Sequence, residues 1–97
     1  MAKTSNKIQQ EDLIELTQSM VRIPSVNPPG NEEELAEFLV QKLESYGFSS
    51  RLVDVKPKRP NVLATLSGKK NGKTILINGH MDVVPVGDLS AWKHEPF

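Results

Sequence analysis

The sequence predicts the α/β fold class, as the opening part of an α/β sandwich whose sheet is incomplete. Two observations support this prediction. Apolar residues first recur at spacings of three and four, as in amphipathic helices, and after Gly47 they recur at a spacing of two, as in strands. The last apolar run leads into Gly79-His80-Met81-Asp82, and in open α/β sheets the ligand crevice lies beyond the carboxyl ends of the strands.

The first predicted element is a helix over residues 10–22. Its apolar positions form one broad stripe, which comprises Leu13, Leu16, Met20 and Ile23 with Ile14 and Val21 beside them. Pro24 should end this helix, because proline lacks a backbone N–H and clashes with the preceding turn. Residues 25–30 then contain two prolines and a glycine, which predict a rigid turn.

A second helix is predicted to begin after Asn31. Asparagine is a favourable N-cap, and Glu34 three residues later completes a variant of the capping box. Glu32 and Glu33 favour the positive end of the helix dipole, so we interpret these glutamates as helix-start residues rather than a carboxylate cluster. Gly47 is suited to the left-handed conformation that ends a helix. The buried face is expected to comprise Leu35, Phe38, Leu39, Leu43 and Tyr46.

Two strands are predicted next, over residues 52–55 and 61–66, which are rich in Val, Leu and Thr. Between them, the basic run at residues 56–60 contains two prolines and is interpreted as a solvated loop without an assigned function.

A third strand is predicted over residues 74–78. The Asn71-Gly72 pair before it favours a tight hairpin with the second strand. Three consecutive apolar residues, Ile75, Leu76 and Ile77, are typical of a strand that is covered on both faces.

The composition excludes several classes of function. Twelve Lys and Arg balance twelve Asp and Glu, so no field favours nucleic acid or an anionic membrane as a partner. With no cysteine, any metal must be held by His, Asp or Glu. Residues 1–10 lack the apolar region of a signal peptide, and no run approaches the ~20 apolar residues of a membrane span. We expect one small cytoplasmic domain.

The chemistry is predicted to lie at His80 and Asp82. On extended backbone, residues two apart point to the same side, so both side chains can face one crevice. Imidazole is a good zinc ligand, and a nearby carboxylate can fix its tautomer and orientation. His80 is therefore the candidate metal ligand and Asp82 the candidate catalytic residue supporting it. The alternative is a structural pair in which the two residues only bond each other.

The sequence from Gly79 to Asp88, followed by Trp92 and Pro96-Phe97, closely resembles the signature of one family. This family comprises dinuclear zinc aminoacylases, acetylornithine deacetylases and succinyl-diaminopimelate desuccinylases, and it includes glutamate carboxypeptidases. Residues 21–30 resemble the exit of the family's first helix, and residues 61–64 resemble its second strand. The resemblance covers nearly all of the chain after about residue 10.

The resemblance implies that residues 1–97 are part of a three-layer α/β/α catalytic domain with a mixed sheet, without the family's dimerisation domain. His80 matches the first zinc ligand, and Asp82 matches the acidic residue behind it. The family's other metal ligands and its general base come after the position of Phe97, so the 97-residue chain is expected to be inactive.

For the complete enzyme, the resemblance implies a homodimer that hydrolyses the amide bond of an N-acyl amino acid or peptide. Two zinc ions, or possible cobalt replacements, would lower the pKa of a bridging water and polarise the scissile carbonyl. The alternative from another class is a non-catalytic binding module that uses its uncovered sheet. His94 is interpreted as an ordinary exposed histidine, and Trp92 as packing its loop onto the domain.

Overall fold

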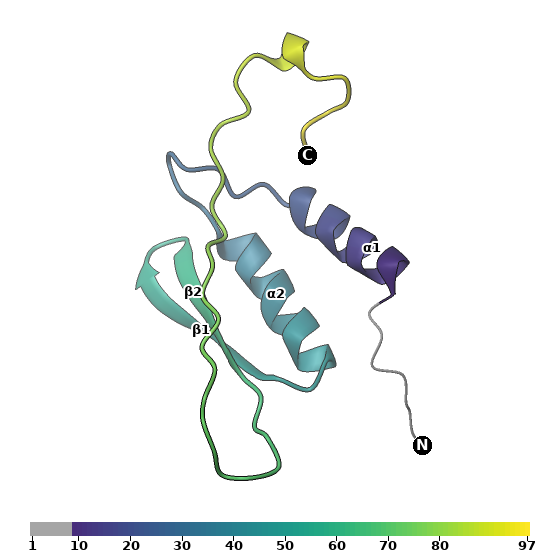
Figure 1. The fold of residues 1–97 in the computed structure, drawn as a ribbon. Helices are drawn as coiled ribbons and strands as arrows, with labels where there is room; N and C mark the ends of the chain where they lie inside the picture. Colours follow the sequence, from purple (N-terminus) through teal and green to yellow (C-terminus); the bar gives the residue numbers. More distant parts are fainter. Residues whose placement is uncertain (1–8) are drawn as a thin grey trace.

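A computed structural model describes residues 9–97 and confirms the α/β class (Figure 1). The elements are α1 (Gln10–Val21), α2 (Glu33–Ser45), β1 (Ser49–Lys56), β2 (Arg59–Thr65) and a short 3-10 turn, η1 (Leu89–Ala91). Most of the segment on which the absence of a signal peptide was predicted lies outside the described residues. Neither α1 nor α2 has the length and apolar character that a membrane crossing requires.

Helix α1 has the predicted limits to within one residue, but none of its residues is buried. Leu13, Ile14 and Val21 of its apolar stripe are exposed. In Figure 1 the helix stands apart from the hairpin, with α2 between them. The other members of the stripe, Leu16, Met20 and Ile23, are partly buried, so the stripe is only partly covered in the described part of the chain.

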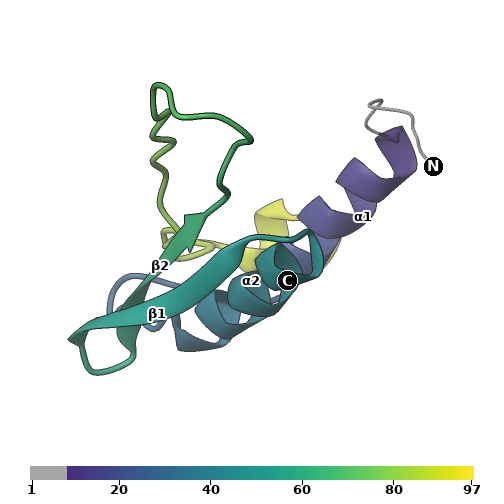
Figure 2. The ribbon, with the colours of Figure 1, turned by 90° about the horizontal axis from the view of Figure 1, so that it is seen from below.

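Helix α2 lies against the β1–β2 hairpin, and the two together form the packed part of the molecule (Figure 2). The buried apolar core consists of Leu35 and Ala36, which are 4% and 0% exposed. The predicted buried face was wrong at Tyr46, which is 58% exposed. Tyr46 is the C-cap residue, so it follows the last helical turn instead of continuing the buried stripe. Phe38, Leu39 and Leu43 are partly buried.

The start of α2 differs by one residue from the prediction. Glu32, not Asn31, occupies the N-cap position, and its own side chain makes no capping bond. The Asn31 Oδ1 atom instead accepts a 3.3 Å hydrogen bond from the Glu33 backbone N–H. At the other end Gly47 has a φ of +95°, as predicted for a left-handed stop.

The hairpin corrects the prediction for the basic run. Only Pro57 and Lys58 form the turn, whereas Lys56 and Arg59 are paired across the two strands. The prolines of this segment predicted a loop. Pro60 nevertheless lies in β2, beside the turn, which is a position in a strand that proline tolerates. Arg59 is thus a strand residue with a fixed direction, and not part of a solvated loop.

The predicted third strand does not form. Residues 66–82 contain no helix or strand, and Ile75, Leu76 and Ile77 are 86%, 85% and 90% exposed. Figure 2 shows the segment after β2 projecting away from α2 as an open loop. An apolar strand of this kind needs neighbours on both sides, and the described chain offers none to it. The predicted mixed sheet is accordingly a two-stranded antiparallel sheet, with one isolated parallel bridge between Val26 and Val83.

An ion pair fastens the hairpin to the start of α2. The Glu32 carboxylate is nearly buried and accepts two hydrogen bonds from the Arg59 guanidinium, at 3.0 Å from Nε and 3.2 Å from Nη2. The Glu32 backbone N–H also donates to the Lys58 carbonyl at 2.9 Å. Gly30 makes room for this arrangement, because a Cβ atom there would lie 2.5 Å from Arg59 Nε.

Replacing Gly30 by alanine should destabilise the fold more than replacing Gly47 by alanine. Both glycines have positive φ angles, +91° and +95°, and an L side chain in such a conformation costs roughly 1–2 kcal/mol. At Gly30 the new Cβ would also displace Arg59, whereas nothing lies within 4 Å of the corresponding position at Gly47. Urea unfolding followed by circular dichroism should show the lowest midpoint for Gly30→Ala. Gly68→Ala, with open space around it, is the neutral control, and equal midpoints for the Gly30 and Gly47 variants would contradict this account.

Candidate functional site

The segment that carries the candidate site is held by the turn after α1. The Asn27 backbone N–H donates to the Val83 carbonyl at 2.8 Å, and the Val83 N–H donates to the Ser25 carbonyl at 3.0 Å. The Ser25 hydroxyl, which is buried, donates to the Met81 carbonyl at 2.7 Å. These bonds fix the backbone on either side of Asp82, although residues 66–80 before it have no regular structure.

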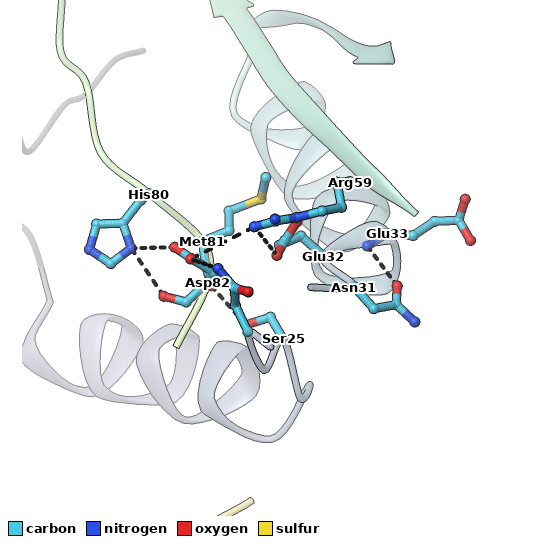
Figure 3. A network of polar contacts seen from close by, with 9 residues as sticks. Ser25, Asn31, Glu32, Glu33, Arg59, His80, Met81 and Asp82 are labelled. Carbon is cyan, nitrogen blue, oxygen red and sulfur yellow. Dashed lines mark hydrogen bonds and ion pairs between the residues drawn. The ribbon is translucent and has the colours of Figure 1, made fainter. Parts of the chain in front are cut away.

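His80 and Asp82 are in direct contact, although the strand on which their predicted common orientation rested does not form. The His80 Nδ1 atom lies 3.0 Å from Asp82 Oδ1 and 3.0 Å from the Asp82 carbonyl oxygen (Figure 3). Both oxygens are acceptors, so for a neutral ring we assign the hydrogen to Nδ1. The Nε2 lone pair is then available for another partner, and the side chain is 82% exposed.

The second oxygen of Asp82 is held by two other side chains. Asn27 Nδ2 donates to Oδ2 at 3.0 Å, and Arg59 Nη2 lies 3.8 Å from the same oxygen. The Asn27 hydrogen bond is the main cause that lowers the pKa of the Asp82 carboxyl below its ordinary value of 3.8, with the contact to His80 acting in the same direction. Asp82 therefore remains an anion near neutral pH, which suits a carboxylate that orients an imidazole.

His80 and Asp82 lie where two surface grooves meet. One groove, of about 710 Å³, runs beside α1, and the other, of about 730 Å³, runs beside the hairpin. Both grooves are lined by His80, Met81 and Asp82. The two side chains thus border open grooves on the surface of the described chain.

The described residues do not by themselves bring together a set of metal ligands. Between residues 9 and 97, no group of three or more His, Cys, Asp or Glu side chains is close enough to hold an ion. The donor chemistry of His80 fits zinc, since its free Nε2 is a neutral imidazole ligand braced by a carboxylate. A catalytic zinc ion normally has about three protein ligands, so the His80 imidazole alone would not make up such a site.

The loop after the site packs onto the domain less than predicted, because Trp92 is 48% exposed. Trp92 Nε1 donates to the Val86 carbonyl at 2.9 Å, so the indole bonds to its own loop. The ring also lines the groove beside α1. His94 is exposed and belongs to no group with His80 that could hold a metal in the described part of the chain.

Three residues that contact Asp82 or anchor its neighbour Arg59 were not identified from the sequence. Asn27 was considered only for the backbone geometry that Pro28 imposes on it, Arg59 was assigned to a loop, and Glu32 was assigned to the helix dipole. The available signals were weak, because each contact joins residues that are far apart in the sequence, by 55 positions for Asn27 and Asp82.

Comparisons with known proteins support the resemblance. The chain is 41% identical over 86 residues to succinyl-diaminopimelate desuccinylase 1 of Ruegeria sp. (strain TM1040), covering 89% of this chain and 22% of that protein. It is 44% identical over 87 residues to succinyl-diaminopimelate desuccinylase of Cereibacter sphaeroides (strain ATCC 17025 / ATH 2.4.3), covering 89% and 22%. It is 35% identical over 91 residues to N-formyl-4-amino-5-aminomethyl-2-methylpyrimidine deformylase of Bacillus subtilis (strain 168), covering 91% and 21%.

The chain thus spans about a fifth of the length of the curated relatives it matches. No protein-family model matches it. No solved structure matches it either.

Replacing Asn27 by alanine should raise the pKa of the Asp82 carboxyl, because it removes the hydrogen bond that lowers this pKa most. The group's pKa is depressed in the folded state, so its stabilising contribution is present at neutral pH and is lost as the pH falls through the folded pKa. The wild type should therefore be more stable than Asn27→Ala at neutral pH, and the difference should shrink in acid.

A carboxyl ¹³C NMR titration measures the pKa, and urea unfolding at several pH values measures the stability difference. Asp88 is the internal control, because its pKa is lowered by bonds from Ser90 and should not change in Asn27→Ala. An unchanged Asp82 titration in Asn27→Ala would show that the Asn27 contact does not act on this carboxyl.

Proposed function

Because the chain belongs to the family of succinyl-diaminopimelate desuccinylases and related amide hydrolases, we propose that His80 is a metal ligand of a hydrolytic site. In this proposal Asp82 is the carboxylate that supports it. The observation that carries the proposal is the 3.0 Å contact from Asp82 Oδ1 to His80 Nδ1, which leaves the exposed Nε2 free. The names of the relatives describe a desuccinylase and a deformylase, and both reactions remove an acyl group.

Each residue has a defined task in the proposed site. Asp82 keeps the Nδ1 hydrogen of His80 engaged, so the ring presents Nε2 as a ligand and cannot rotate freely. Asn27 keeps the carboxylate of Asp82 turned toward the ring by occupying its other oxygen. When bound, zinc would supply a Lewis acid that polarises a scissile carbonyl and lowers the pKa of a water.

The proposed substrate class is an N-acyl amino acid or a peptide, cleaved at its amide bond. The proposal extends to two zinc ions, with cobalt as an alternative, and to a homodimeric complete enzyme. The further ligands and the general base must come from groups that residues 9–97 do not bring together. We accordingly propose that the 97-residue polypeptide alone binds zinc weakly and does not turn over substrate, because one imidazole holds the ion poorly against water.

The competing proposal is a purely structural His80–Asp82 pair. The high exposure of the His80 side chain argues against it, because a structural pair is expected to bury its polar contact or to fasten two elements. In the described part of the chain, the polar contacts of the His80 ring are with Asp82, two residues away, so the ring does not join two elements. The two proposals differ in one measurable respect, which is whether zinc perturbs the ring.

Zinc titration of the 97-residue chain, followed by NMR signals of the histidine rings, should perturb His80 and leave His94 unchanged. His80→Ala should abolish the specific response, and Asp82→Asn should weaken the affinity by about 10-fold or more, because the ligand loses its supporting carboxylate. His94→Ala is the matched control and should behave like the wild type.

In the same samples, assays with N-succinyl and N-acetyl amino acids should detect no hydrolysis. A submicromolar zinc affinity together with turnover would overturn the account of a partial site. A zinc response that persists in His80→Ala but disappears in His94→Ala would mean that the wrong histidine was chosen.

A further inference from the structure

We propose that Arg59, anchored by Glu32, is a positioning residue that holds the Asp82 carboxylate in the orientation required by His80. This inference rests on the proposed function, since it assigns the support of the same site. It concerns residues outside the Gly-His-x-Asp sequence, and it follows from three features of the contact network in Figure 3.

The first feature is that Arg59 is itself immobilised. Its guanidinium makes two bonds to Glu32, at 3.0 Å and 3.2 Å, and the Glu32 residue is only 5% exposed. A two-bond contact of this kind fixes both the position and the plane of a guanidinium. Gly30 also packs against the Arg59 side chain, and it lies so close that a Cβ atom at this position would not fit.

The second feature is that the same Nη2 atom that binds Glu32 also faces Asp82. Its distance to Asp82 Oδ2 is 3.8 Å, which is too long for a hydrogen bond but short enough for a charge interaction in a partly buried setting. Asn27 makes the hydrogen bond to that oxygen, at 3.0 Å. Arg59 thus supplies a positive charge that favours this orientation of the Asp82 carboxylate. The hydrogen bond from Asn27, which is directional, sets where the carboxylate points.

The third feature is that two carboxylates converge on one cation. Glu32 is fixed by its burial and by the backbone of the hairpin turn, whereas the Asp82 side chain is partly exposed and each of its oxygens is held by one short side-chain contact, from Asn27 or His80. Without the charge of Arg59, the two anions would repel each other, and Asp82 is the one able to turn away. Its Oδ1 would then leave His80 Nδ1, and the ring would lose its fixed tautomer.

The test uses the folded 97-residue chain with ¹⁵N-labelled histidine, at a pH above the ordinary histidine pKa of about 6.5, so that the rings are neutral. Long-range ¹⁵N–¹H spectra report which ring nitrogen carries the hydrogen. In the wild type, His80 should carry it on Nδ1. In Arg59→Met, the His80 nitrogen signals should move toward each other as the two tautomers mix, while the His94 signals stay in place.

Arg51→Met is the matched control, since Arg51 also lies in the hairpin and is exposed. It should leave the His80 signals unchanged. The double variant Arg59→Met/Glu32→Gln removes the repelling charge as well, so it should restore part of the wild-type signal pattern. Zinc affinity should fall by about 10-fold in Arg59→Met and recover partly in the double variant.

Unchanged His80 signals in a folded Arg59→Met variant would overturn the positioning role while leaving the proposed function standing. Conversely, altered His80 signals in Arg59→Met together with an unaltered zinc response in His80→Ala would support the positioning role and refute the metal-ligand proposal.

Amide spectra show whether each variant is folded. If Arg59→Met does not fold, Arg59→Lys decides the question. A lysine keeps the charge but cannot bind Glu32 with two bonds and face Asp82 at once, so the His80 signals should move in the same direction by a smaller amount. Wild-type His80 signals in Arg59→Lys would overturn the proposal.

Discussion

The bond between Glu32 and Arg59 is the interaction on which the rest of this small structure depends. The buried apolar core of the described chain is limited to Leu35 and Ala36, so burial alone gives little to orient the hairpin against α2. The ion pair joins the first residue before α2 to the first residue of β2, with two hydrogen bonds and almost no exposure of the carboxylate. Removing either partner would leave a charge without compensation beside the core, which is far more costly than losing a surface pair.

A second set of contacts holds residues 81–83, which include Asp82, beside the Glu32–Arg59 ion pair. The turn at residues 25–27 binds residues 81–83 through backbone bonds and the Ser25 hydroxyl. Asp82 is the residue at which both sets meet, because it contacts Asn27 from the turn and faces Arg59 from the hairpin. The site is therefore positioned by two separate parts of the fold, even though the segment before it, residues 66–80, lacks regular structure.

What could be predicted from the sequence follows the range of the interactions involved. The helices and the two strands depend mainly on residues within a few positions of one another, and local periodicity predicted them. The hairpin was predicted for the wrong pair of strands, because the Asn71-Gly72 pair lies outside the observed β1–β2 hairpin. The sequence could not reveal that Glu32, one of three adjacent glutamates, would be buried, because its partner Arg59 is 27 positions away. The role of Asn27 was missed for the same reason, because its partner Asp82 is 55 positions away. The run at residues 75–77 was predicted as a strand from its apolar character, but strand formation needs partner segments, and the described chain provides none.

The exposed apolar run and the incompleteness of the proposed metal site have a common physical basis. A strand that is apolar on both faces requires neighbouring strands on either side and helices above and below it. In an open α/β sheet, the carboxyl ends of such neighbouring strands are also where further ligand-binding side chains would be presented to His80. The segments that would cover Ile75, Leu76 and Ile77 are thus the same kind of segments that would add donors to the site. What residues 9–97 contribute is one exposed imidazole whose ring contacts Asp82, and no further group of metal-binding side chains is brought together among them.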